Sequence, residues 1–386
     1  MIAGKGPLSD MTVVEVGSLV AGPAMGSLLQ ILGATIIKIE QPTVGDPSRT
    51  VSPWGFLNYN FGKRSLSLNL KDKEGQDIFQ RLIRTVDILI ENLGPGVSER
   101  LGFSYRTISQ INPRLIYCSV KGFASTSNLR DKPAFDAVAQ ALSGMMSLTG
   151  EPGGEPVRIG NPSVDLGAAA YGTIGVLSSI LERQKTGRGT FIEIPLLDMS
   201  VYWNGYWLTY FAITGNMPER LGSGHLGYSP HKTFKSRDGR YVFIATLSDA
   251  QWDKLRNLLK IDLGREYDKM AHRIRHRSIV EKEVEKAVSE LDADQIIALL
   301  GNDVPCARVN TVSDVYYDPD LNRRNIIVNT NSGAGKKVGI VLPPLASVPA
   351  GSEVKSPRVG EDTDSILKSL GYTRDQIEGF RARKVI

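Results

Sequence analysis

A single aspartate, Asp165, has the residue type and the setting of a nucleophile. No other carboxylate lies between Glu155 and Glu182, and a long apolar stretch follows Asp165 directly. An aspartate ordinarily has a pKa of about 3.9, so it is ionised at neutral pH, and at the start of a helix it faces the positive end of the helix dipole. The same features describe an ordinary cap of a helix over residues 166–183, because aspartate is a common cap residue. The local sequence leaves both interpretations open.

Other reactive side chains are few. Cys118 and Cys306 lie far apart and predict neither a disulfide framework nor a metal cluster, which is typical of a reducing cytoplasm. The four histidines lack the spacing of a zinc protease, so no metal site is predicted. His225 and His231 belong to a residue type that titrates near neutrality, but nucleophilic attack by a carboxylate needs no histidine. We therefore leave both out of the catalytic candidates.

Length, charge and hydropathy narrow the class of protein. The 386 residues, 41% of them hydrophobic, can bury a large core in about two domains. The net charge of +5 comes from dispersed basic residues and gives only weak support for nucleic-acid binding, since a small polyanionic ligand explains local basic groups equally well. We see no signal sequence, and no apolar run that approaches the roughly 18–20 residues of a membrane span. We expect a cytoplasmic protein that is not inserted in a membrane.

The first half of the chain alternates β-branched runs with helical patterns. Strands are predicted at 12–16, 35–40, 86–91 and 115–121, and helices at 24–32 and 73–84. This order predicts an α/β domain with a Rossmann-like parallel sheet. The first loop lacks G-x-G-x-x-G, so the pattern gives no support for a dinucleotide cofactor.

The second half changes in character. A strand at 191–194 precedes an aromatic-rich helix at 197–213, whose tyrosines at i, i+4 spacing indicate packing against a partner surface. A glycine-rich stretch at 221–230 indicates a boundary or a mobile loop. Strands at 232–234 and 240–245 and a mostly helical region at 251–300 predict a smaller α+β domain that ends near Asn325.

An ordered set of motifs spans nearly the whole chain. They are VEVGSLVAGP at 14–23, LGATIIKIE at 32–40, GDP at 45–47, NFGKRS at 60–65, DILIENLGPG at 87–96, INPRLI at 111–116, KTGRG at 185–189 and GEDTD at 360–364. In this order and spacing they resemble the class III CoA-transferases, the formyl-CoA transferase-like family that includes L-carnitine CoA-transferases and α-methylacyl-CoA racemases.

The resemblance implies a reaction and a site. The family aspartate at the position of Asp165 attacks an acyl-CoA thioester to give an acyl-aspartyl anhydride and then an aspartyl-CoA thioester, before CoA moves to a second carboxylic acid. Exchange between two carboxylates is nearly isoenergetic, so no metal and no tightly bound cofactor is required. By resemblance the CoA-binding residues are Leu19, Val20, Ala21, Asn92, Leu93, Arg100, Lys121 and Phe135. For Arg100 and Lys121 a solvated surface charge is the alternative.

The resemblance also implies an assembly. The family is an interlocked homodimer whose large domain is built from both chain ends, which gives a large CoA-binding domain at 1–220, a small α+β domain at 221–325 and a returning C-terminal segment at 326–386. The partners expected are an acyl-CoA, a small carboxylic acid and a second copy of the chain. The loop at 222–227 is then either a lid over the active site or an interdomain linker.

Three departures from the family bear on specificity. Val20, Phe135 and Gln41 replace the glutamine, tyrosine and arginine of the formyl-CoA:oxalate enzymes, so oxalate is not expected as the acceptor. Phe135 also replaces the histidine of the racemases, and Asp136 beside it has no evident charged neighbour that would make it a stronger base. A CoA-transferase is therefore favoured over a racemase. A CoA-binding protein without activity is a third alternative, but it predicts loss of the aspartate that this chain retains.

Overall fold

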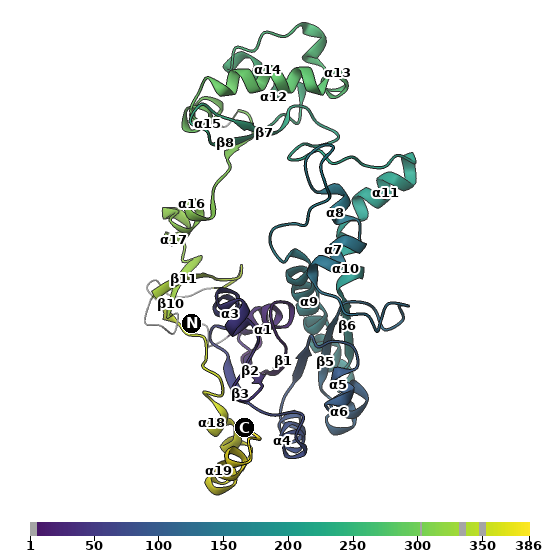
Figure 1. The fold of residues 1–386 in the computed structure, drawn as a ribbon, viewed down its shortest axis with the longest axis vertical. Helices are drawn as coiled ribbons and strands as arrows, with labels where there is room; N and C mark the ends of the chain where they lie inside the picture. The colour runs from purple at the N-terminus through teal and green to yellow at the C-terminus, as the bar shows by residue number, and fades with distance from the viewer. Residues whose placement is uncertain (1–5, 302, 332–336, 347–352) are drawn as a thin grey trace. The chain divides into compact units, whose positions relative to one another are not determined.

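The computed structural model describes residues 6–301, 303–331, 337–346 and 353–386, and Figure 1 labels its elements. The chain forms two compact units, each built from separate stretches of sequence. The large unit comprises Met1–Met145, Arg158–Thr209 and Asp318–Ile386, and the small unit comprises Met146–Val157 and Tyr210–Tyr317. Both ends of the chain therefore belong to the large unit.

A six-stranded parallel sheet forms the centre of the large unit, in the order β3-β2-β1-β4-β5-β6. Its strands are β1 (Thr12–Val16), β2 (Thr35–Glu40), β3 (Arg64–Ser67), β4 (Ile88–Glu91), β5 (Ile116–Lys121) and β6 (Phe191–Pro195). The strand order reverses between β1 and β4, so the loops that follow these two strands diverge. In open parallel sheets such a switch point is where ligands bind.

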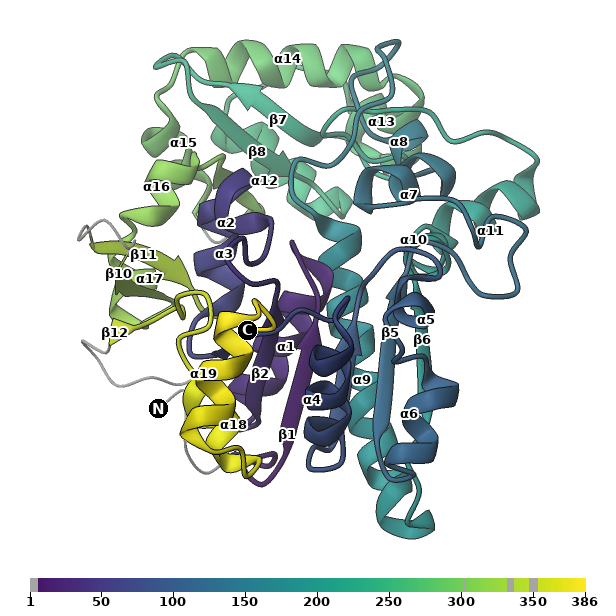
Figure 2. The same cartoon turned by 60° about the horizontal axis from the view of Figure 1, so that its bottom comes forward.

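Helices cover both faces of this sheet, as Figure 2 shows. One face packs on α1 (Ala21–Ile31), α7 (Asp136–Leu142), α9 (Ser163–Thr186) and α10 (Leu196–Trp203). The other packs on α4 (Lys73–Ile83), α6 (Tyr105–Ile111), α18 (Thr363–Ser369) and α19 (Arg374–Ala382). Because side chains alternate along a strand, Ile36 and Ile37 of β2 enter opposite cores. Burial on both faces explains why these strands are almost continuously apolar.

The rest of the large unit consists of short elements. These are α2 (Ser48–Val51), α3 (Pro53–Asn60), α5 (Val97–Arg100), α17 (Pro319–Arg323), and a small sheet of β10 (Ile327–Asn331), β11 (Lys337–Val341) and β12 (Glu353–Val354). α8 (Met145–Leu148) and α11 (Gly205–Thr214) span the points where the chain passes between the units.

The small unit has its own core. Its antiparallel sheet contains β7 (His231–Lys235), β8 (Tyr241–Ala245) and β9 (Cys306–Arg308). Its helices are α12 (Asp249–Leu258), α13 (Met270–Arg275), α14 (Arg277–Ser289), α15 (Ala293–Leu300) and α16 (Val312–Tyr316), with a 3₁₀ turn at Arg265–Asp268. Trp252, Val280 and Val284 are fully buried between the helices and the sheet.

Several element boundaries differ from those predicted. The helix predicted at 197–213 is broken at Asn204 into α10 and α11. Strand β3 was not predicted, because it is only four residues long and three of them are polar. The expectation of no membrane-length apolar run was wrong, since α9 has an 18-residue window with a mean hydropathy of 1.4, long and apolar enough by composition to cross a membrane. Half of that window is buried, and α9 packs in the core with α1.

Candidate active site

A cavity of about 210 Å³ lies at the switch point of the sheet. The loops after β1 and β4, the end of β5, the segment before α7 and the start of α9 all contribute to it. Eight of the nine residues predicted from the sequence line it, namely Leu19, Val20, Ala21, Asn92, Leu93, Lys121, Phe135 and Asp165. Arg100 is the ninth. It lies on α5 with an exposed side chain that has no hydrogen bond or ion pair to any residue the structure describes.

The loop after β1 is held by side chains from the segments that follow β4 and β2. The Asn92 side chain accepts a hydrogen bond from the Ser18 N–H at 2.9 Å and donates one to the Ser18 carbonyl at 2.9 Å. The next residue, Leu19, adopts a left-handed conformation with φ of 63°, and its N–H approaches Asp46 Oδ1 at 3.4 Å. No side chain caps α1 at Val20, so this helix end offers N–H groups to an anionic substrate group.

Buried charges anchor the same loop. Lys38 Nζ contacts Glu15 Oε1 at 2.9 Å, Asp46 Oδ2 at 2.8 Å and the Gly17 carbonyl at 2.8 Å. Burial would lower the pKa of Lys38, but the charges of Glu15 and Asp46 outweigh it and raise the pKa. Lys63 pairs with the other oxygen of Glu15 at 2.7 Å, and burial lowers the pKa of Lys63 to about 8.

Sequence reasoning missed this cluster of Glu15, Lys38, Asp46 and Lys63. A signal was present, because Glu15 and Lys38 each interrupt an otherwise apolar parallel strand. A charge at such a position is almost never buried unless it is paired.

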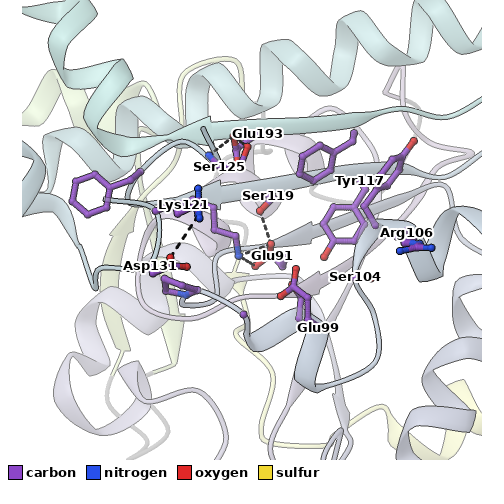
Figure 3. Close-up of a pocket in the computed structure, with 17 residues that line it drawn as sticks. Glu91, Glu99, Ser104, Arg106, Tyr117, Ser119, Lys121, Ser125, Asp131 and Glu193 are labelled. Atoms are coloured by element: carbon purple, nitrogen blue, oxygen red, sulfur yellow. Dashed lines mark hydrogen bonds and ion pairs between the residues drawn. The ribbon is translucent and has the colours of Figure 1, made fainter. Parts of the chain in front are cut away.

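The loop after β4 is held by a second ion pair, shown in Figure 3. Lys121 Nζ lies 2.8 Å from Glu91 Oε1, and the Lys121 side chain is only 19% exposed. Ser119 Oγ donates to Glu91 Oε1 at 2.5 Å, and the Leu93 N–H donates to Glu91 Oε2 at 2.8 Å. The alternative of a solvated surface charge is therefore wrong for Lys121.

Asp165 lies in the first turn of α9 but does not cap it. The helix begins at Ser163, so Asp165 is its third residue, and the cap position is held by Pro162, which makes no side-chain hydrogen bond. Asp136 Oδ2 instead accepts hydrogen bonds from the N–H groups of Val164 at 2.8 Å and Asp165 at 3.2 Å. The capping interpretation of Asp165 was wrong. Among the described residues its carboxylate has no hydrogen-bond or ion-pair partner.

The surroundings of Asp165 change its basicity. Burial, and next the charge of Asp136, raise the pKa of Asp165 to about 7. The expectation that Asp165 is an ordinary, fully ionised aspartate is therefore corrected. The expectation that Asp136 has no charged neighbour is corrected too, because Asp165 is that neighbour. A more basic carboxylate is a stronger nucleophile when ionised, and a pKa near neutrality keeps a substantial ionised fraction.

This pKa predicts a pH-dependent gain in stability for Asp165→Asn. The folded pKa of about 7 lies above the ordinary value of 3.8, so ionising Asp165 costs folding free energy. The neutral carboxyl group of Asp165 contributes to the free energy of unfolding. This contribution is fully present below pH 4 and is lost as the pH rises through about 7. Above pH 7 the free energy of unfolding of Asp165→Asn should exceed that of the wild type by on the order of 2–4 kcal/mol, since each unit of pKa shift is worth about 1.4 kcal/mol.

Urea unfolding from pH 4 to pH 8 measures this difference. Asp198→Asn is a matched control, because Asp198 lies in the first turn of α10 with an exposed side chain. A constant difference between Asp165→Asn and the wild type across this range would contradict the raised pKa.

Two further cavities adjoin the first. One of about 220 Å³ shares Leu19 and Val20 with it and is lined also by Trp54 and Tyr59. Burial, and next the charge of Asp165, raise the pKa of Tyr59. Leu19 and Val20 therefore separate two spaces near Asp165.

The other cavity, of about 430 Å³, is the one drawn in Figure 3 and shares Pro95, Lys121 and Arg130 with the first. One wall is aromatic, with the Tyr105 and Phe191 rings 5.1 Å apart. Lys121 therefore lies on the border between this space and the cavity that contains Asp165.

Two basic residues at the first cavity were missed from the sequence. Arg130 and Lys132 both line it. Arg130 pairs only weakly with its neighbour Asp131, at 3.5 Å, and the Lys132 side chain is exposed without a polar partner among the described residues. They lie in an irregular segment outside the quoted motifs, so no periodicity pointed to them. Both side chains therefore place positive charge at the lining of this cavity.

The glycine loop at 222–227 lies in the small unit. Arg277 donates to the carbonyls of His225 at 2.7 Å and Leu226 at 3.0 Å, which ties the loop to α14. Its role as a lid or a linker stays a prediction.

Comparisons with known proteins place these features in a family. The model of CoA-transferase family III matches residues 8–363. A succinate–glutarate CoA-transferase of Agrobacterium fabrum is 30% identical over an alignment of 391 positions, which covers 95% of this chain and 96% of that protein. A succinyl-CoA:mesaconate CoA-transferase of Haloarcula marismortui is 30% identical, covering 88% and 90%. An acetyl-CoA:oxalate CoA-transferase of Acetobacter aceti is 32% identical, covering 88% of each chain.

A solved structure shares the fold. A CAIB/BAIF family protein from Brucella suis superimposes with a TM-score of 0.84 at 30% identity, over 95% of this chain and all of that one.

Proposed function

The chain belongs to CoA-transferase family III and moves CoA from an acyl-CoA thioester to a carboxylic acid, and we propose that Asp165 is the nucleophile that carries the CoA between them. The observation that carries this proposal is the Asp165 carboxylate itself. It lines the switch-point cavity, lacks a partner among the described residues and has a pKa raised to about 7.

The proposed reaction has four balanced steps. One oxygen of Asp165 attacks the thioester carbon, which forms a mixed anhydride and releases the CoA thiolate. The thiolate attacks the aspartyl carbonyl, which forms the aspartyl-CoA thioester and releases the donor acid with one oxygen from Asp165. The acceptor carboxylate then attacks the aspartyl carbonyl, which forms a second anhydride and frees the thiolate again. Attack of this thiolate on the acceptor carbonyl gives the new acyl-CoA and restores Asp165.

The lining of the cavity suits these steps. We place the thioester end of CoA between the loops of Leu19 to Ala21 and of Asn92 and Leu93. Phe135 lines the same cavity and is 64% exposed. An aromatic ring can shield an anhydride from water, but it cannot accept or donate the α-proton that a racemase must move. This favours transfer over the racemase alternative. CoA enters as a substrate, and we propose no tightly bound cofactor.

We propose that the acids are small dicarboxylates. The support is two basic residues in the cavity of Asp165, namely Lys132, which has no polar side-chain partner among the described residues, and Arg130, which is paired with Asp131 at 3.5 Å. Arg130 also borders the cavity of about 430 Å³, whereas Lys132 lines the cavity of about 210 Å³ and not the larger one, so we place Lys132 at the acyl group. A distal carboxylate would bind such cations strongly. All three relatives described above carry the name of a dicarboxylate, namely succinate–glutarate, mesaconate and oxalate.

A donor and acceptor panel tests the substrate class. Donors are succinyl-CoA, glutaryl-CoA and butyryl-CoA, and acceptors are succinate, glutarate, mesaconate, formate, carnitine and oxalate, with products identified by mass spectrometry. We expect at least about a tenfold preference for succinyl-CoA over butyryl-CoA. Lys132→Met should reduce it, and oxalate should be a poor acceptor. Equal use of butyryl-CoA and succinyl-CoA would rule out the dicarboxylate proposal and leave the transferase function untouched.

We also propose that the protein is an interlocked homodimer in the cytoplasm. The support for the dimer is an apolar surface on α10 and α11, where Tyr202, Tyr206 and Ile213 are 71%, 69% and 79% exposed. Large exposed apolar patches mark interaction sites. A monomer at micromolar concentration in sedimentation velocity would contradict the dimer.

A further inference from the structure

We propose that Lys121 acts in CoA binding indirectly, as a positioning residue that fixes the backbone of Leu93, and not as a ligand of a CoA phosphate. The inference rests on the proposed function of this cavity. It assigns Glu91, which lies at the end of β4 and is 1% exposed, to the same task.

The donor count of the ammonium group supports this role. An ammonium group has three N–H donors. Lys121 Nζ lies 2.8 Å from Glu91 Oε1, 2.9 Å from Glu91 Oε2 and 2.9 Å from the Leu93 carbonyl oxygen. Two of its three donors are therefore directed at protein acceptors, and its charge is paired with the buried carboxylate of Glu91. A phosphate that drew Lys121 away would leave Glu91 without its partner, and a buried carboxylate without its partner is strongly unfavourable.

The two residues of the ion pair form hydrogen bonds with both polar backbone groups of Leu93. Glu91 Oε2 accepts the Leu93 N–H at 2.8 Å, and Lys121 donates to the Leu93 carbonyl. Ser119 lies two residues before Lys121 on β5, and its hydroxyl group donates a hydrogen bond to the other oxygen of Glu91, as Figure 3 shows. The two charges thus join the ends of β4 and β5 to the cavity loop.

The neighbouring residue extends this support across the sheet. Asn92 holds the N–H and the carbonyl of Ser18 in the loop after β1. Lys121 and Glu91 fix Leu93, and Asn92 fixes Ser18, so the two loops of the switch point are connected through paired contacts. Loss of the ion pair should loosen the loop that contacts CoA while leaving Asp165 in place on α9.

A double-mutant cycle on CoA binding tests the inference. Glu91→Gln, Lys121→Met and the double variant are compared by calorimetric titration with CoA and with 3′-dephospho-CoA, at low and high salt. Each single variant should weaken CoA binding by about tenfold. The double variant should bind CoA at least as tightly as the single variant with the lower affinity, because the effects of two substitutions in one network are not additive. The salt dependence and the discrimination against 3′-dephospho-CoA should stay those of the wild type. Lys368→Met, an exposed lysine on α18, is the matched control.

Two results would overturn the inference. If the losses of CoA affinity are additive, and the salt dependence of binding is flatter in both Lys121→Met and the double variant, Lys121 contacts a phosphate directly. Unchanged CoA affinity in the single variants would mean that Leu93 needs no such support. If a single variant fails to fold, the uncharged double variant still decides the question through its salt dependence. Binding is measured without turnover, so failure of the proposed transfer reaction would show up separately, in the substrate panel.

Discussion

We expect the Asp165→Ala variant to lose CoA transfer by at least about 10³-fold in kcat, because the carboxylate forms covalent bonds to both halves of the reaction. CoA binding should remain within a few-fold of the wild type, because Asp165 is placed at the reacting carbon and not at the phosphates. The measurement is kcat with the best donor and acceptor pair, together with the Kd for CoA. Asp165→Asn should behave alike, which separates the loss of the nucleophile from the loss of volume.

Arg100→Ala provides the contrast for this prediction. Arg100 lies outside the cavity of Asp165, with an exposed guanidinium group that has no polar partner among the residues the structure describes. As a distant CoA contact it should raise the Kd for CoA and leave kcat nearly unchanged. Substantial transfer by Asp165→Ala would sink the nucleophile assignment, whatever the behaviour of Arg100→Ala.

The second large effect is expected at Asp136. Its carboxylate raises the pKa of Asp165 and also accepts the N–H groups of Val164 and Asp165 at the start of α9. In the wild type, kcat/KM should rise with pH until about 7, as Asp165 ionises. Asp136→Asn removes the neighbouring charge, so the pKa of Asp165 falls and the rising part of the profile moves to lower pH. The measurement is the pH profile of kcat/KM between pH 5 and pH 9.

Stability separates the two roles of Asp136. Asparagine keeps one acceptor oxygen, so Asp136→Asn should lower the free energy of unfolding by only about 1–2 kcal/mol. Asp136→Ala leaves the N–H of the fully buried Val164 unpaired and should cost on the order of 2–4 kcal/mol. A profile unchanged in Asp136→Asn, with the stability loss present, would mean that Asp136 only caps the helix.

Much of the fold followed from the sequence because its signals are local. The strands at 12–16 and 35–40 are apolar runs between turn residues, and β1 and β2 have these bounds in the structure. Their alternation with helices predicted the parallel sheet, and the sheet brought the separate loops at 19–21 and 92–93 to one cavity. The family resemblance carried by the motifs predicted eight of the residues that meet there, although Arg100 lies outside the cavity and Arg130 and Lys132 were missed.

The parts that the sequence did not predict depend on long-range contacts. Asp136 accepts the Val164 N–H at the start of α9 although the two residues are 28 positions apart in the chain, so no capping pattern near Asp165 indicated this contact. Glu91 and Lys121 are neighbours only because β4 and β5 pair in the sheet. The pKa of Asp165 likewise depends on burial and on a carboxylate from another helix. Local spacing left Asp165 as either a cap or a nucleophile, the family resemblance favoured the nucleophile, and its basicity and support required tertiary structure.

The covalent role of Asp165 is the central claim, and oxygen-18 labelling tests it most directly. The acceptor acid is labelled in its carboxylate, the enzyme is allowed to turn over, and the peptide that contains Asp165 is isolated and weighed. In the proposed reaction the acceptor leaves one of its oxygens on the aspartyl group when CoA departs with the new acyl group. We therefore predict oxygen-18 in the Asp165 carboxylate, dependent on both substrates. Continued transfer with an unlabelled Asp165 would contradict the covalent mechanism.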